Sequence, residues 1–251
     1  MPSDARFRTD RRGERSMSTV IDMEPSVRIV VLSAGVSDPS STRLLADRIA
    51  VRVGDGLAAE DVTAMTTVVE LAPLAVDIAR AVVTRLRSEQ LEAAIDALSQ
   101  ADAVIAATPV YKAGISGLFK SFVDLLDEDV MIAKPTILAA TAESTRHAMV
   151  VDDQLRPLFA FMRALSVPTS VFAAPEDWGS TALGSRIERA ATELVQLVIS
   201  RVGHRMADAA WRHYRHRFGG SASRAEKSSA DVDFDTDLMR LATGGSAHQV
   251  G

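Results

Sequence analysis

Short apolar runs alternate along this chain with segments of helical periodicity. The runs cover residues 27–32, 65–71, 103–107, 135–140 and 169–173. Between them, apolar residues recur every three or four positions within 41–53, 81–98, 115–126 and 151–165, which is the spacing of an amphipathic helix. Strands that alternate with helices form a parallel sheet, and unbroken apolar strands are typical of sheets buried on both faces. We therefore expect an α/β fold with a doubly wound, five-stranded parallel sheet and helices on both faces.

Two of these segments carry additional information. The run 65–71 contains Thr66, Thr67 and Glu70, so we expect it near an edge of the sheet. Pro157 falls inside the helical pattern of 151–165. Because proline cannot donate a hydrogen bond within a helix, this position predicts either a kink or a helix that begins later than the pattern suggests.

The two ends of the chain lack this periodicity. Residues 1–25 are polar and charged, and residues 218–251 begin with a Gly/Ser-rich stretch. Such composition is typical of segments that do not pack into a core. We expect a disordered N-terminal arm over 1–25, one folded domain over 26–217 and a flexible tail over 218–251.

The composition excludes several classes of function. The chain has no Cys, which rules out disulfides, thiolate nucleophiles, zinc–cysteine sites and iron–sulfur ligation. The net charge of −5 gives no reason to expect a nucleic-acid partner, and we interpret the basic and aromatic residues of 211–218 as the end of a solvated helix. We expect no metal site. Apolar runs are too short to span a membrane and no signal peptide is recognisable, so we expect a cytoplasmic protein.

Hydroxyl groups gather in the loop after the first strand. They belong to Ser33, Ser37, Ser40, Ser41 and Thr42. In doubly wound folds, ligands bind at the carboxyl ends of the strands, and a helix N-terminus there offers N–H donors and a positive dipole end to a phosphate. Arg43 could pair with the same dianion through two parallel hydrogen bonds. A capping role of Ser40 or Ser41 is the alternative, but one cap needs only one hydroxyl, so the loop favours a phosphate.

The loop after the third strand carries Thr108-Pro109-Val110-Tyr111-Lys112. A flat cofactor needs a backbone turn with exposed N–H groups and a planar wall. Pro109 could fix the turn, and Tyr111 could supply the wall. As the alternative, Tyr111 packs on the following helix and Gly114 only relieves crowding. The residues alone leave both interpretations open.

The two loops in combination resemble those of the NAD(P)H-dependent FMN reductases of flavodoxin-like fold, which include the reductase components of two-component flavin monooxygenases. The resemblance covers about residues 27–175. It implies that the first loop holds the FMN phosphate through Ser33, Ser40, Ser41, Thr42 and Arg43. It implies that the second loop holds the isoalloxazine edge through Pro109, Val110, Tyr111 and Lys112. In the loop after the fourth strand, the flavin would approach Thr141, Ala142, Glu143 and Ser144.

Two positions depart from the family pattern and a third matches it. Glu143 stands where relatives usually have glycine, and we expect it to point outward or to pair with Arg146. Ile115 replaces an aromatic residue that alkanesulfonate-type relatives associate with a helix bulge and a tetramer interface. His147 matches a family position at the start of the next helix, where we expect an orienting hydrogen bond rather than catalysis.

The resemblance implies an enzyme that transfers a hydride from NADPH or NADH to N5 of FMN and supplies reduced flavin to a partner monooxygenase. It also implies a homodimer or homotetramer. No catalytic acid or base is expected, because the cofactor carries the redox chemistry. Two alternatives stay open. One retains FMN and reduces a quinone, an azo dye or a metal oxyanion; the other is a non-catalytic electron carrier or phosphate-sensing module.

Overall fold

Seven strands form one sheet in the computed structural model, which describes residues 26–210 of the chain. The strands are β1 (Val27–Ser33), β2 (Ala64–Glu70), β3 (Ala103–Tyr111), β4 (Gly114–Ile115), β5 (Pro135–Thr141), β6 (Leu165–Ser166) and β7 (Val171–Ala173). The helices are α1 (Ser41–Ala58), α2 (Ala75–Thr84), α3 (Glu89–Ser99), α4 (Gly117–Val123), α5 (Arg156–Phe161), α6 (Thr181–Ile199) and α7 (Val202–Ala210). A π-helix at Val151–Leu155 and 3-10 helices at Thr145–His147 and Pro175–Asp177 complete the regular structure of this part.

The strand order is β2-β1-β3-β5-β6, with β4 paired to β3 and β7 paired to β5. All pairings are parallel except that of β3 with β4. This is the order of flavodoxin-like sheets. The predicted doubly wound parallel sheet is confirmed, and so is the edge position of the polar strand β2.

The predicted count of five strands is too low. One of the two additional strands lies at the edge of the sheet opposite β2. Both β6 and β7 pair with β5 in succession, so they occupy the place of one interrupted strand. Pro168 lies in the interruption and cannot donate a ladder hydrogen bond. There Arg156 binds the carbonyls of Val167 and Pro168 at 2.9 and 3.1 Å. The remaining extra strand, β4, is a two-residue return after β3.

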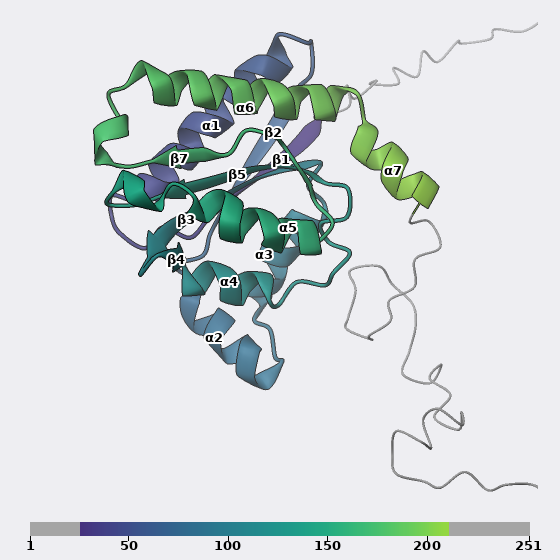
Figure 1. Ribbon diagram of the computed structural model, residues 1–251. Helices are drawn as coiled ribbons and strands as arrows, with labels where there is room; N and C mark the ends of the chain where they lie inside the picture. Colours follow the sequence, from purple (N-terminus) through teal and green to yellow (C-terminus); the bar gives the residue numbers. More distant parts are fainter. Residues whose placement is uncertain (1–25, 211–251) are drawn as a thin grey trace, which may run out of the picture.

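Helices cover both faces of the sheet (Figure 1). On one face, Ile29 and Val31 of β1 pack with the buried sides of α1 and α6. On the other, Val30 and Leu32 pack with residues of α2, α3, α4 and α5. All four strand residues are at most 2% exposed, which accounts for the unbroken apolar run in the sequence.

The predicted helix over 81–98 is two helices. Arg85 follows α2 with a left-handed φ of 63°, and Ser88 caps α3 by accepting a hydrogen bond from the Leu91 N–H at 3.2 Å. Val83 and Leu86, which the helical pattern placed on a buried face, are 82% and 70% exposed. The prediction failed because it joined two apolar stripes across a cap signal at Ser88.

Two other predicted helices are shorter than their patterns. Within 115–126, Ile115 belongs to β4, and only Gly117–Val123 is helical, with Phe119 and Phe122 fully buried. Within 151–165, a π-helix precedes α5, whose first turn contains Pro157. A late start is thus what Pro157 indicates, since the first turn of an α-helix tolerates proline.

The predicted N-terminal arm, the C-terminal tail and the basic–aromatic segment 211–218 lie outside the described residues. Within residues 26–210, none of the helices combines the length and the apolar character that crossing a bilayer requires.

Candidate functional site

The carboxyl ends of β1, β3 and β5 meet at one edge of the sheet. Ser33, the last residue of β1, is in register with Ala107 of β3, and Pro109 is in register with Thr141 at the end of β5. The three loops in which the sequence places its candidate residues are therefore neighbours. In flavodoxin-like sheets this is the ligand-binding edge.

The loop after β1 is tightly folded around Gly35. A Cβ atom built on Gly35 would lie 1.9 Å from the Ser40 hydroxyl oxygen and 3.2 Å from the Thr42 Cβ. Ser40 caps α1, because its hydroxyl accepts a hydrogen bond from the Arg43 N–H at 3.2 Å. Ser33 is buried at the base of the loop. Any side chain at position 35 would fill the space between β1 and the Ser40 cap. We call this space the Gly35 cradle.

The N-terminus of α1 presents backbone donors to this loop. The first N–H groups of a helix have no partner within it. Ser40 serves that of Arg43, whereas those of Ser41 and Thr42 have no protein acceptor among the described residues. The helix is 18 residues long, and its first turn contains no acidic residue. Donors, dipole and the Gly35 cradle together suit a dianion such as a phosphate.

A buried hydroxyl pair joins the first and third loops. The Thr42 and Thr141 oxygens are 2.7 Å apart, and the two residues are 2% and 4% exposed. Only one proton lies between them, so the other hydroxyl keeps its proton for a further acceptor. The sequence predicted both residues for the site but not their contact.

Arg43 points along the outside of α1. Its Nε donates to Asp47 at 2.8 Å, and Nη1 lies 3.1 Å from Glu70 at the end of β2. The hydrogen bond to Asp47 raises the pKa of the guanidinium despite its partial burial, and Glu70 adds to the effect. These two contacts occupy N–H groups on Nε and Nη1, so the two-pronged grip on a phosphate expected from the sequence would use the remaining N–H groups of Nη1 and Nη2.

The loop after β3 is a hairpin with a two-residue turn. Tyr111 pairs with Gly114 and Val110 with Ile115. Lys112 and Ala113 between them have φ values of 50° and 64°, the left-handed conformation of a type I′ turn. Pro109 is buried, Lys112 is exposed and Tyr111 is 49% exposed. About half of the Tyr111 surface is thus open to solvent, where a flat ligand could contact it.

Side chains outside the predicted set hold this hairpin. The buried Thr108 hydroxyl accepts from the Ser116 N–H at 3.1 Å and donates to the Pro109 carbonyl at 3.0 Å. The Gln154 carboxamide donates to the Ala113 carbonyl at 3.0 Å and accepts from the Ile115 N–H at 3.1 Å. Thr108 stands inside the recognisable motif. Gln154 is 41 residues from Ala113, and no local pattern marks it.

The loop after β5 follows Thr141 and begins with Ala142, whose N–H donates to the Ala173 carbonyl at 3.2 Å. Glu143 is exposed, as expected. Its expected alternative partner Arg146 donates to His147 instead, at 3.2 Å. Ser144 caps the 3-10 helix by accepting from the Arg146 N–H at 3.4 Å. The loop thus offers backbone and a buried hydroxyl near the first loop, with its carboxylate at the surface.

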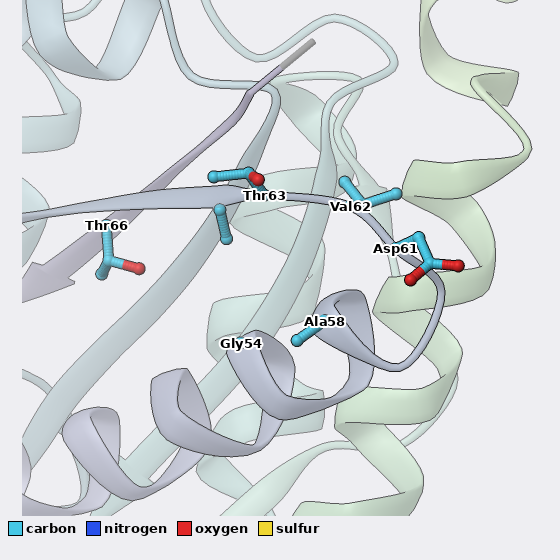
Figure 2. A pocket seen from close by; sticks show the side chains of 7 residues that line it. Gly54, Ala58, Asp61, Val62, Thr63 and Thr66 are labelled. Carbon is cyan, nitrogen blue, oxygen red and sulfur yellow. The ribbon is translucent and has the colours of Figure 1, made fainter. Parts of the chain in front are cut away.

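An open groove of about 740 Å³ lies elsewhere, between the C-terminal half of α1 and the beginning of β2 (Figure 2). Its lining residues are Gly54, Ala58, Asp61, Val62, Thr63, Ala64 and Thr66. Because β1 and β2 run parallel, the beginning of β2 is at the opposite edge from the three loops. The groove is therefore separate from the candidate site.

Comparisons with known proteins agree with this geometry. The family described as NADPH-dependent FMN reductase matches residues 27–179. An NADH-dependent FMN reductase of Pseudomonas putida is 36% identical over 70% of this chain and 94% of its own length. An NADPH-dependent FMN reductase of Pseudomonas aeruginosa is 33% identical over the same shares.

Two solved structures share both fold and sequence. An oxidoreductase from Corynebacterium diphtheriae is 45% identical with a TM-score of 0.68, covering 70% of this chain and 98% of its own. The ligand-free form of an NADH:FMN oxidoreductase is 28% identical with a TM-score of 0.60, covering 68% and 89%. With the matched segment spanning β1 to the end of the sheet and all three loops, the chain belongs to the NADPH-dependent FMN reductase family.

Proposed function

We propose that this protein is an NAD(P)H:FMN oxidoreductase whose three carboxyl-end loops bind FMN. The observation that carries the proposal is the N-terminus of α1, where the Gly35 cradle faces backbone donors that have no acceptor among the described residues. Family membership supports the same activity, since relatives with NADH and with NADPH in their names match most of this chain.

The flavin phosphate would lie against the first turn of α1. The N–H groups of Ser41 and Thr42 would donate to it, and the hydroxyls of Ser33 and Ser40 lie at the base and rim of the same loop. Arg43 would act mainly through its positive charge, because Asp47 and Glu70 hold its guanidinium. Hydrogen bonds of this type to a charged group are each worth about 1.5–3 kcal/mol.

The isoalloxazine would lie between the hairpin and the loop after β5. Pro109 and Val110 would contact its edge, and Tyr111 and Lys112 would limit one side of the ring. Across from them, the backbone of Thr141 to Ser144 would approach the ring, with Glu143 turned to solvent. Because the Thr42–Thr141 pair links this loop to α1, the contact would hold the phosphate end and the ring end of the proposed site at a constant distance.

FMN, when bound, would supply the redox chemistry by accepting a hydride at N5 from NADH or NADPH. The protein residues would bind, orient and partly shield the reacting groups. No side chain is assigned a proton-transfer role. His147 accepts a hydrogen bond from Arg146, which fits the orienting role expected from the sequence.

Reduced FMN would then pass to a separate flavin-dependent monooxygenase, and the reductase would act as a homodimer or homotetramer. Absorbance at 340 nm under anaerobic conditions tests the activity. NADH or NADPH should be oxidised only when FMN is present, in amounts equal to the FMN reduced. No oxidation of either nucleotide would overturn the proposal in favour of an electron carrier.

Steady-state kinetics distinguish release of reduced flavin from retention. Saturation by added FMN, with reduced FMN recovered in the filtrate after ultrafiltration, is the expected result. Ping-pong kinetics with flavin that stays bound, and turnover only with a quinone, an azo dye or a metal oxyanion, would indicate a flavin-retaining reductase instead.

A further inference from the structure

The turn of the β3–β4 hairpin is one that its own residues disfavour. Lys112 and Ala113 are both left-handed, a conformation that side chains other than Gly, Asn and Asp rarely adopt. Two-residue turns of this kind usually contain Asn-Gly or Gly-Gly. The only glycine here, Gly114, comes one position later. The local sequence therefore does not account for the turn.

One distant side chain compensates for this. The Gln154 amide donates to the Ala113 carbonyl at 3.0 Å, and its oxygen accepts from the Ile115 N–H at 3.1 Å. A neighbouring strand forms hydrogen bonds with the backbone groups of every second residue. Gln154 bonds residues 113 and 115 in the same way, through its side chain. A Cβ on Gly114 would lie 3.3 Å from the Gln154 oxygen, so a glycine between the two contacts allows the close approach.

Gln154 is carried by a segment fixed to the body of the domain. It belongs to the π-helix Val151–Leu155, in which Val151 and Leu155 are fully buried. A π-turn contains one residue more than an α-turn, which shifts the direction of the side chains after it. Directly after it, Arg156 binds the carbonyls of Val167 and Pro168. The base from which Gln154 reaches the hairpin is thus anchored on both sides.

We propose that Gln154 is a positioning residue that holds the β3–β4 hairpin in the conformation that presents Tyr111 and Lys112 to the flavin. The inference rests on the proposed function for what the hairpin contacts, but the bracing itself is a property of the ligand-free protein. Gln154 acts on the turn, not on the reacting atoms. Its loss should weaken FMN binding while the rate at saturating FMN is preserved.

The test compares Gln154→Met with a matched control, Gln90→Met, because Gln90 is an exposed glutamine on α3 without a side-chain hydrogen bond among the described residues. In the ligand-free protein, amide exchange measured by NMR should become about tenfold faster at Ser116 in Gln154→Met only. The Ser116 N–H donates to the Thr108 hydroxyl at the base of the hairpin and not to Gln154. The FMN Kd and the KM for FMN should rise about three- to tenfold, with kcat within twofold of wild type. The control should leave all four quantities unchanged.

A rescue experiment separates bracing from a general structural defect. Glycine adopts the left-handed conformation without penalty, so Ala113→Gly should let the turn form without help. In that background, Gln154→Met should change the FMN Kd by less than twofold. An equal loss in both backgrounds, a loss confined to kcat, or unchanged Ser116 exchange and FMN Kd in Gln154→Met would overturn the inference.

The outcomes also separate this inference from the proposed function. A wild-type protein that does not bind FMN would overturn the function, and Ser116 exchange would still decide whether Gln154 holds the hairpin. A wild-type protein that binds FMN, with variants that do not differ from it, would overturn the inference alone.

Discussion

Two loops at the same edge of the sheet are held in opposite ways. The loop after β1 is packed around Gly35, capped by Ser40 and tied to β5 by the buried Thr42. The hairpin after β3 is exposed, has two left-handed residues in its turn and depends on Gln154 from another part of the chain. The first region is specified mainly by neighbouring residues, the second by a tertiary contact.

This difference assigns separate tasks to the two regions. A rigid loop with fixed N–H donors costs little reorganisation when a dianion binds, so it should provide most of the affinity. A braced but exposed hairpin can adjust, so it should contribute less to affinity and more to the placement of the ring. Substitutions in the first loop should therefore weaken FMN binding more than those at the hairpin.

The largest effect on affinity is expected for Gly35→Ala. The new Cβ would lie 1.9 Å from the Ser40 hydroxyl oxygen and would force it away. This removes the helix cap and shifts the N–H donors of α1. We expect the FMN Kd to rise about 100-fold, or about 2.7 kcal/mol, and the free energy of unfolding to fall by about 1–2 kcal/mol. Fluorescence titration and urea unfolding measure the two effects.

Gly54→Ala is the matched control in the same helix. A Cβ at Gly54 has no neighbouring atom within 4 Å, so the FMN Kd should not change. The free energy of unfolding should rise by up to about 1 kcal/mol, since alanine is the better helix former. If the two variants bound FMN equally well, the assignment of the phosphate to the Gly35 loop would be wrong.

A smaller effect is expected for Thr42→Val, which leaves the Thr141 hydroxyl buried without its partner. The free energy of unfolding should fall by about 1–3 kcal/mol, and the FMN Kd should rise about tenfold because the link between the two loops is lost. Thr42→Ser retains the hydroxyl and should restore most of the affinity. A serine variant as weak as the valine variant would show that the hydroxyl contact alone does not hold the two loops together and that the methyl group is needed as well.

Arg43→Gln should have a still smaller effect. Because Asp47 and Glu70 hold the guanidinium, its contribution to phosphate binding is a screened charge interaction. We expect an increase of about threefold in the FMN Kd at low salt. Almost none is expected at 1 M salt, where the Debye length is only about 3 Å. A loss of about 100-fold that persists in salt would mean that Arg43 grips the phosphate directly through its remaining N–H groups.

A substitution at Lys134 should not change FMN affinity, although it should change stability. Lys134 lies just before β5, at the edge of the sheet opposite the site, and its ammonium group donates to the carbonyls of Leu98 and Ser99 at 2.6 and 2.9 Å. Burial lowers the pKa of Lys134 from 10.5 to about 8. Between these two pH values the unfolded chain binds more protons than the folded one, so Lys134 makes stability rise with pH.

Lys134→Met should remove that rise, which amounts to as much as about 3 kcal/mol between pH 8 and 10.5. Urea unfolding of both proteins at several pH values measures it as a difference in slope. The FMN Kd at pH 7 should stay within twofold of wild type. A large change in FMN affinity would contradict the separation between the site and the far edge of the sheet.

The sequence predicted the fold because its dominant signal is local. Each buried strand is a continuous apolar run, and the loops that follow β1, β3 and β5 contain the hydroxyls and the Pro109–Lys112 motif. The errors arose where tertiary structure overrides periodicity. Left-handed Arg85 divides one predicted helix, and the hairpin removes Ile115 from another.

At the site, the sequence identified side chains but not their partners. The two carboxylates that pair with Arg43 belong to Asp47, four residues later in the chain, and to Glu70 at the end of β2. The contact between Thr42 and Thr141 joins residues 99 positions apart. Such pairings follow from the strand order and from the path of α1 over the sheet, which no local pattern contains.

The central claim is that the α1 N-terminus binds the phosphate of FMN, and a comparison of FMN with riboflavin tests it most directly. The two ligands differ only in that phosphate, so the ratio of their Kd values, measured by fluorescence quenching at fixed salt, isolates its contribution. We predict that wild type binds FMN at least 100-fold more tightly than riboflavin, and that Gly35→Ala reduces the ratio to about tenfold or less. Equal affinities in wild type, or a ratio that Gly35→Ala leaves unchanged, would contradict the account.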